Sequence, residues 1–369
     1  MLKILKNFFT RPRDEENDKY NTLCATAIKR GCSPEAAELI QKMYRRNEIA
    51  ESDVRKYIRD LEYCNDPQEL IRRFVNEERP EGNPRQHDRN SAIIGAIYGD
   101  IIGSRYEGQR LDSVEEALRD PLNFRCAMTD DSITTIATLK AVRLGESPIL
   151  RKHISPADIT RMNTYPYEKN PFTEIYKEAV RKYPDAGYGG HFYMWGISED
   201  PRPYGSCGNG AAMRVSPIGA LLDQQKQVIT FAFRSAMTTH NHIEGVKGAI
   251  VTAMCIWMAR SGYSKRQIFE YMKTHYSYGT ILFSQWTYEE ARQISGHQMM
   301  CQYSVPAAVI SFMESSDFTE AIAKAACAGL DTDTNACICG GIAGAYYGVD
   351  DGVRNVVRVH CERQNITFP

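Results

Sequence analysis

Long runs of alanine, glycine and apolar residues dominate the chain after residue 90. They lack the regular alternation of apolar and polar residues that marks half-buried strands, and glycine or proline bounds them. The pattern predicts an all-α domain over residues 91–369, interrupted by an irregular excursion from Tyr165 to Gly210, which is rich in Pro, Gly and Tyr. The clearest helical runs are SAIIGAIYGDIIG, SITTIATLKAVRL, VKGAIVTAMCIWMAR, FTEAIAKAACAGL and NACICGGIAGAYYG.

Charge density separates the first 90 residues from the rest, because residues 1–90 are about twice as rich in charged side chains. Helix-start signals at Ser33, Ser52 and Asp66 predict three short helices, and residues 79–90 are typical of a linker. We therefore expect residues 1–90 to form a charged, helical and partly flexible N-terminal extension. It either packs on the core or binds a partner.

Bulk composition excludes several classes of protein. The chain has 369 residues, 43% of them hydrophobic, and a formal net charge of -1. A near-neutral chain without a basic patch is not expected to bind nucleic acid or a membrane surface. The N-terminus has no signal-peptide core and no apolar run is of membrane-spanning length, so a cytoplasmic location is expected. The 11 scattered cysteines indicate reduced, mostly buried thiols.

Three acidic motifs follow in order along the predicted helical domain. GDIIGSRYEG, at residues 99–108, ends an apolar helix at Gly99 and Asp100 and places Glu107 in the next loop. MTDDSITTIATLKA begins a helix with the TDD triplet of residues 129–131. The stretch DTDT, at residues 331–334, opens the run NACICGGIAG.

Crowding of carboxylates favours a metal site over simple helix capping. Asp130 and Asp131 are adjacent, Asp331 and Asp333 nearly so, and a helix cap needs only one. Such carboxylates repel one another unless a cation or a proton lies between them. With the threonine hydroxyls they supply hard oxygen ligands that suit Mg²⁺. If the two clusters converge, they could hold two ions. Three glycines would then let the helix that follows DTDT pack closely against its neighbours: Gly340, Gly341 and Gly344.

A glycine loop precedes another predicted helix. In YGSCGNGAAMR, Gly208 and Gly210 flank Asn209, and the helix begins near Ala211. Free backbone N–H groups at that point suit a phosphate or a ribose. Two histidines lie between the next predicted helices and are either structural or solvated, or catalytic: His240 and His242.

The ordered set GDIIGSRYEG, TDD, GNGAAMR, THNH and GLDTDTNA resembles the ADP-ribosylglycohydrolase family, from about residue 91 to the C-terminus. The resemblance implies an orthogonal all-α bundle with a binuclear Mg²⁺ site. It implies that Thr129, Asp130 and Asp131 bind one face of the metal pair and that Asp331, Asp333 and Thr334 bind the other. The catalytic residues that it implies are Glu107, Asp130 and Asp333; Glu107 would orient water or ligate a metal. The ADP-ribose contacts that it implies are Gly208, Asn209, Gly210, Ala211, Met213, Arg214 and His240.

The resemblance implies a Mg²⁺-dependent hydrolase that removes ADP-ribose from mono-ADP-ribosylated proteins, with arginine favoured as the acceptor. Arginine-specific members use a further acidic residue, for which Asp158, Glu168 and Glu174 remain alternatives. Immunity proteins against ADP-ribosyltransferase toxins resemble this arrangement of a glycohydrolase domain behind an N-terminal extension. The competing hypothesis is therefore a partner-binding immunity protein that acts mainly through residues 1–90. A structural protein on an inactive hydrolase fold is a third reading.

Overall fold

The computed structural model describes only part of the chain: residues 88–111, 113–144, 154, 159, 170–276, 288–293 and 299–369. These residues belong to a compact unit from Pro80 to Pro369. The three helices predicted within residues 1–90 lie outside the described residues, as do Asp158 and Glu168. The domain boundary at residue 90 therefore stays a prediction.

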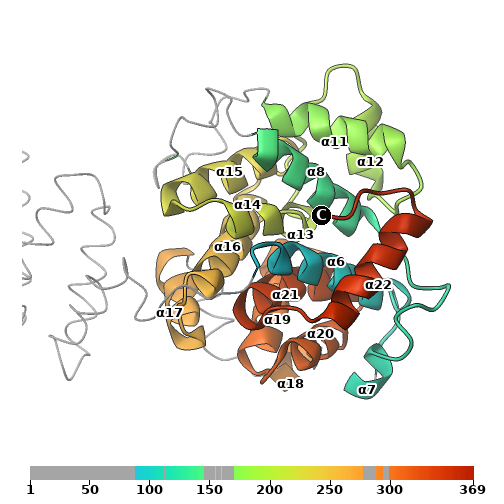
Figure 1. Cartoon of the computed structure of the whole chain (residues 1–369). Helices are drawn as coiled ribbons and strands as arrows, with labels where there is room; N and C mark the ends of the chain where they lie inside the picture. The colour runs from blue at the N-terminus through green and yellow to red at the C-terminus, as the bar shows by residue number, and fades with distance from the viewer. Residues whose placement is uncertain are drawn as a thin grey trace, which may run out of the picture. The chain divides into compact units, whose positions relative to one another are not determined.

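All regular secondary structure in the described ranges is helical, which confirms the predicted all-α class. An isolated antiparallel bridge joins Gly208 to Met300. The helices, labelled as in Figure 1, are α6 (Asn90–Ser104), α7 (Val114–Ala117), α8 (Asp130–Leu144), α11 (Pro171–Lys182), α12 (Gly190–Ile197), α13 (Gly210–Met213), α14 (Ser216–Leu221), α15 (Gln225–Met237), α16 (Ile243–Arg260), α17 (Lys265–Tyr276), α18 (Tyr288–Gln293), α19 (Cys301–Met313), α20 (Phe318–Ala326), α21 (Thr332–Tyr347) and α22 (Asp351–Arg363).

The stretch from Tyr165 to Gly210 is not wholly irregular, so that prediction was wrong. It contains α11 and α12. The side chain of Asn170 accepts a hydrogen bond from the backbone N–H of Phe172 at 3.0 Å, and Pro171 occupies the first turn. An N-cap followed by proline is a strong helix start, and α11 then buries one face while its other face stays polar. The abundance of Pro, Gly and Tyr concealed this signal.

Helices α6 and α21 form the centre of the described unit and share its most extensive helix–helix contact. Figure 1 shows them between α8, α13 and α14 on one side and α19 and α20 on the other. Both are buried on all sides over most of their length. A helix surrounded in this way needs no polar face, which explains the apolar runs in the sequence.

Glycines let the two central helices cross with their backbones in contact. A side-chain carbon added at Gly95 would overlap the carbonyl oxygen of Gly340, and one at Gly344 would overlap that of Ser91. The same holds for Gly99 against Ala336. Close packing at the glycines of α21 is therefore confirmed. The predicted end of the first helix at Gly99 was wrong, because this glycine serves packing and α6 continues to Ser104.

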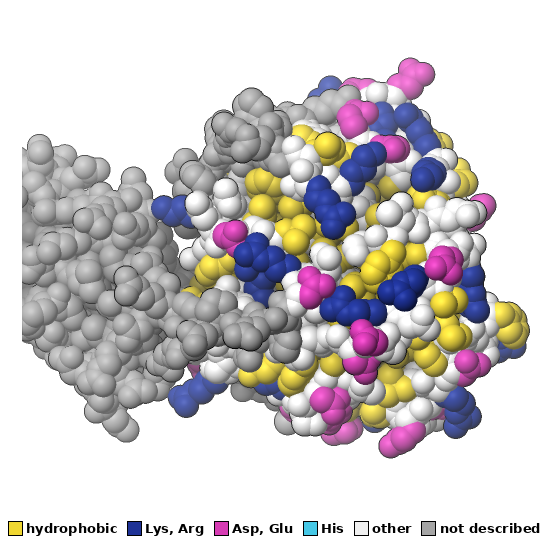
Figure 2. All heavy atoms as spheres, in the orientation of Figure 1, with side chains coloured by type: hydrophobic (Ala, Val, Ile, Leu, Met, Phe, Trp, Pro, Cys, Tyr) yellow, Lys and Arg dark blue, Asp and Glu magenta, His cyan; other side chains and the backbone are white. Residues whose placement is uncertain are grey.

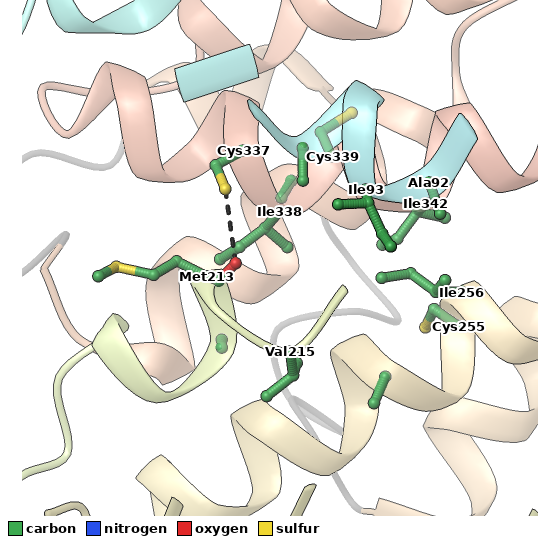
Figure 3. Close-up of a cluster of buried hydrophobic side chains, with 14 of the residues drawn as sticks. Ala92, Ile93, Met213, Val215, Cys255, Ile256, Cys337, Ile338, Cys339 and Ile342 are labelled. Atoms are coloured by element: carbon green, nitrogen blue, oxygen red, sulfur yellow. Dashed lines mark hydrogen bonds between the residues drawn. The ribbon is translucent and has the colours of Figure 1, made fainter. Parts of the chain in front are cut away.

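Apolar side chains fill the space around this crossing, as Figure 3 shows for residues such as Ile93, Ile256 and Ile338. The Cys337 thiol donates to the carbonyl oxygen of Met213 at 3.4 Å. Every cysteine among the described residues is a free thiol, and all but Cys207 are buried. This confirms that the cysteines are mostly buried in that part of the chain, as predicted.

The surface agrees with the near-neutral composition. Figure 2 shows basic and acidic side chains dispersed among neutral and hydrophobic ones on the face it presents. Among the residues that the structure describes, no helix combines the length and the apolar character needed to cross a bilayer.

Candidate functional site

Asp100 of α6 anchors the start of α8. Its carboxylate accepts hydrogen bonds from the Thr129 N–H at 2.9 Å, the Thr129 hydroxyl at 2.8 Å and the Ser132 N–H at 3.0 Å. The Ser132 hydroxyl donates to it as well. Thr129 directly precedes α8 and Ser132 lies in its first turn, so a carboxylate from another helix caps the start of α8. Asp130 and Asp131 are therefore not needed as caps.

The start of α21 is held against the end of α6. A side-chain carbon on Gly103 would overlap the backbone of Asp333, so only glycine allows this approach. The Thr332 hydroxyl donates to the carbonyl oxygen of Gly103 at 2.7 Å. Asp331 occupies the N-cap position, but its side chain makes no capping hydrogen bond. The capping alternative for Asp331 is therefore wrong.

Three carboxylates from three helices converge at this point. One oxygen each of Asp100, Asp131 and Asp333 can be chosen so that all three lie within 4.8 Å of one another, and all three residues are buried. The Thr334 hydroxyl donates to Asp131 Oδ2 at 3.2 Å, whereas Asp131 Oδ1 is buried with no hydrogen-bond partner in the described ranges. An unpartnered buried carboxylate oxygen among other carboxylates matches the hard oxygen ligands of Mg²⁺ or a similar cation. We call these three residues the carboxylate cluster.

Burial and mutual repulsion raise the pKa values of these acids. The pKa of Asp333 rises to about 10, chiefly through burial and then through Asp331. Burial, followed by Asp333, raises the pKa of Asp131 well above its ordinary value. The pKa of Asp100 rises only to about 6, because hydrogen bonds from Ser132 and Thr129 oppose the effect of burial. These raised pKa values favour protonated acids when no cation is bound, and a bound cation would replace those protons.

Asp130 and Glu107 lie at the edge of the cluster. Asp130 is half-buried, and burial followed by Asp100 raises its pKa to about 8. Glu107 is exposed in the turn after α6, as predicted, and the Gly108 N–H donates to the Leu330 carbonyl oxygen at 2.8 Å. This bond holds the turn beside Asp331. Partial burial, then Asp331, raises the pKa of Glu107.

Gly208, Asn209 and Gly210, here called the ligand loop, are tied to the acidic residues. The Asn209 side-chain amide donates to Asp331 Oδ2 at 2.6 Å and to the Ser304 hydroxyl at 2.8 Å. The structure thus brings together the predicted loop and the predicted DTDT motif. Ala211 and Met213 follow in α13 with buried side chains, and Met213 Sδ lies 3.9 Å from the Thr334 hydroxyl.

Arg214 and His240 are buried in the interior on the side of the ligand loop that faces the core. Arg214 is 0% exposed, and its guanidinium donates to the Ser235 carbonyl oxygen at 2.9 Å and lies 4.5 Å from the centre of the Tyr176 ring. The side chain of Arg214 therefore has no access to a ligand in this conformation, contrary to the direct contact predicted for it. His240 is buried, and its Nε2 faces the loop: a carbon on Gly210 would lie 3.4 Å from it.

Sequence reasoning placed Asp100 at a helix end and did not count it among the site residues. A signal was available, since Asp100 is the one charged residue in the run SAIIGAIYGDIIG. A carboxylate within an apolar helix requires hydrogen-bonding partners or a cation. Which partners it finds depends on the packing of α8, and the sequence of α6 does not specify that packing.

Comparisons with known proteins show which family and which fold this chain resembles. The family model described as ADP-ribosylglycohydrolase matches residues 83–366. Human and bovine ADP-ribosylhydrolase ARH3 are each 26% identical to this chain; the matches cover 70% of this chain and 85% and 84% of those proteins. A solved structure, entitled "ADP-ribosylglycohydrolase-related protein complex", has a TM-score of 0.51 and 20% identity, covering 75% of this chain and 94% of that one. The similar structure supports the fold.

Proposed function

The chain belongs to the ADP-ribosylglycohydrolase family, and we propose that it is a Mg²⁺-dependent hydrolase that releases ADP-ribose from mono-ADP-ribosylated proteins, arginine-linked ahead of serine-linked. The observation that carries this proposal is the buried carboxylate cluster of Asp100, Asp131 and Asp333 with its unpartnered oxygen. The preference for arginine rests on the order of motifs in the sequence. Glu174, exposed in the first turn of α11, is the one candidate for acceptor recognition that the structure describes.

We propose two divalent cations, for which the buried carboxylates supply hard oxygen ligands. Asp131 and Asp333 would hold them together with the hydroxyl of Thr334 and, at the edge, Asp130 and Asp331. Bound cations would act as Lewis acids toward oxygen atoms of the ribose. Asp100 is occupied by four hydrogen bonds from Thr129 and Ser132, so its contribution is to fix the TDD turn.

The protein groups around the cluster suit cleavage of the bond to the distal ribose. Asn209 holds the ligand loop against Asp331, which would set the ribose beside the carboxylates. Glu107 is exposed and its raised pKa brings it toward the range useful for proton transfer, so it would orient a water molecule and accept its proton. Burial of the cluster excludes bulk water, which strengthens electrostatic interactions there.

The test is release of free ADP-ribose from arginine- and serine-modified proteins, in Mg²⁺ and in EDTA. The native chain is compared with Asp130→Ala and Asp333→Ala. We expect metal-dependent release from arginine-modified protein that both substitutions abolish. Release from serine-modified protein alone would overturn the proposed preference for arginine as the acceptor. No release from either protein in saturating Mg²⁺ would overturn the proposed hydrolase function.

We propose a separate role for residues 1–90 from the sequence alone. The charged extension would bind a protein partner, an ADP-ribosyltransferase toxin in the immunity-protein reading, and the whole chain would act in the cytoplasm. Binding of such a toxin by the full chain should disappear when residues 1–90 are deleted. Equal binding by both proteins would eliminate this role and leave the hydrolase proposal untouched.

A further inference from the structure

Three buried polar side chains are hydrogen-bonded in series, and the last of them lies next to the ligand loop. Arg214 and Thr239 are 0% exposed, and His240 is 4% exposed. Arg214 Nη2 donates to the Thr239 hydroxyl at 3.0 Å, and that hydroxyl lies 2.6 Å from His240 Nδ1. A continuous hydrogen-bonded path therefore joins the guanidinium to the imidazole ring.

The direction of each hydrogen bond in this path can be assigned. A guanidinium only donates, so the Thr239 hydroxyl accepts from Arg214 and must place its own hydrogen elsewhere. In the part of the chain that the structure describes, the acceptor within reach is His240 Nδ1. Leaving a buried hydroxyl without an acceptor costs about 1–3 kcal/mol. His240 Nδ1 therefore accepts a hydrogen bond and carries no hydrogen.

The remaining ring nitrogen then carries the hydrogen. Burial, followed by the charge of Arg214, lowers the pKa of His240 well below its ordinary value, so the ring stays neutral. Nε2 faces the ligand loop, since carbons added to Gly208 and Gly210 would lie 3.6 and 3.4 Å from it. No acceptor for Nε2 occurs among the described residues. The ring thus presents an N–H group that is free to bond a ligand.

We propose that Arg214 and Thr239 are positioning residues that fix His240 as the Nε2–H tautomer, so that the ring donates a hydrogen bond to an oxygen of ADP-ribose on the ligand loop. The identity of the ligand rests on the proposed function. Where the ligand oxygen only accepts, as a phosphate or ether oxygen does, the opposite tautomer would turn a lone pair toward it and weaken binding. Glycine at positions 208 and 210 keeps the path from Nε2 to the ligand open.

The tautomer can be read directly by ¹⁵N NMR of the full chain labelled in its histidines. His240→Gln removes one signal and so assigns His240 among the 8 histidines. We expect Nε2–H in the native chain. Thr239→Val removes the donor to Nδ1 and should populate the other tautomer, whereas Thr239→Ser keeps a hydroxyl and should restore the native signal.

Calorimetric titration with ADP-ribose in Mg²⁺ tests the consequence for binding. Thr239→Val should weaken binding roughly fivefold to tenfold, the size of one hydrogen bond, and Thr239→Ser should not. In a His240→Gln background, whose amide donates regardless of residue 239, Thr239→Val should add no further loss. A merely structural role for Thr239 predicts an equal loss in both backgrounds, which would overturn the proposal.

The two proposals fail differently. A native chain that binds ADP-ribose while His240 carries its hydrogen on Nδ1 would contradict the inference about Arg214 and Thr239 alone. A chain with the Nε2–H tautomer that binds no ADP-ribose would contradict the proposed function and, with it, the ligand named here. If the Thr239→Val variant changed the tautomer without changing the affinity, the proposed hydrogen bond from His240 to the ligand would be ruled out.

Discussion

Two buried polar regions flank the ligand loop, and they differ in how their buried charges are compensated. On one side, the carboxylate cluster of Asp100, Asp131 and Asp333 gathers acids of one sign and leaves an oxygen of Asp131 without a partner. On the other, the cation Arg214 lies over the Tyr176 ring and donates to Ser235 and Thr239.

This difference indicates which buried polar groups need a bound ligand to compensate their charge. Arg214 also has one buried nitrogen, Nη1, without a hydrogen-bond partner among the described residues, but its Nε and Nη2 bond neutral acceptors and its guanidinium lies over an aromatic ring, so no second charge of the same sign has to be balanced there. The acids of the cluster are too close together for all three to be ionised at once without a cation. The excess of like charge, rather than burial itself, therefore distinguishes the site from the scaffold.

The largest effect is expected from removing a carboxylate of the cluster. Asp131→Ala deletes an oxygen donor and should lower ADP-ribose release at least about a thousandfold, a loss of about 4 kcal/mol of transition-state stabilisation. It should also abolish thermal stabilisation by Mg²⁺. Asp185→Asn, at an exposed turn, is the control and should retain both. A variant at position 131 that still gains stability from Mg²⁺ would show that the cation binds elsewhere.

The next effect is a pH dependence of the metal-free protein. The folded pKa of Asp333 is raised to about 10, far above the ordinary value near 4 of an unfolded aspartate. The unfolded chain therefore ionises first as pH rises, and folding stability falls from about pH 4 upward. In EDTA we expect a loss of about 1 kcal/mol per pH unit between pH 5 and 8, measured by urea unfolding.

Mg²⁺ should reverse that trend, because binding replaces the protons and becomes tighter as pH rises. The stability gained from Mg²⁺ should thus be greater at pH 8 than at pH 5. Asp131→Asn provides a matched control, since it removes one of the acids and should flatten the slope in EDTA. A metal-free protein that is equally stable at pH 5 and pH 8 would contradict the raised pKa values.

A smaller effect is expected from the crossing of α6 and α21. Gly103→Ala would force a methyl group against the backbone of Asp333 and should destabilise the fold by about 2 kcal/mol, with weaker binding of Mg²⁺. Gly189→Ala adds a methyl group where no atom lies within 4 Å and should change stability by less than about 0.5 kcal/mol. Equal unfolding midpoints for the two variants would refute the close-packing argument.

The smallest effect concerns the link between the ligand loop and the acids. Asn209→Ala removes the amide that bonds Asp331 and Ser304, and should raise the Kd for ADP-ribose roughly tenfold, about 1.4 kcal/mol. Folding should be little affected. Asn355→Ala, exposed on α22, is the control. An unchanged Kd for Asn209→Ala would mean that the loop keeps its position without this amide.

Much of the fold was predictable because α6 and α21 are buried on all sides, and their composition alone indicates helices within a core. The stretch containing α11 and α12 was not, because local start signals were masked by prolines and glycines. The crowding of Asp130, Asp131, Asp331 and Asp333 predicted a cation site, and the structure brings Asp131 and Asp333 together.

The sequence by itself determined the helical class, the oxygen-rich character of the site and its family resemblance, since these depend on residue type and order. The tertiary structure alone decided that Asp100 joins the cluster, that Arg214 turns inward and that Thr239 meets His240. The physical reason is that these contacts join residues on different helices or fix a side-chain direction. Both depend on how the helices pack, to which every interface contributes.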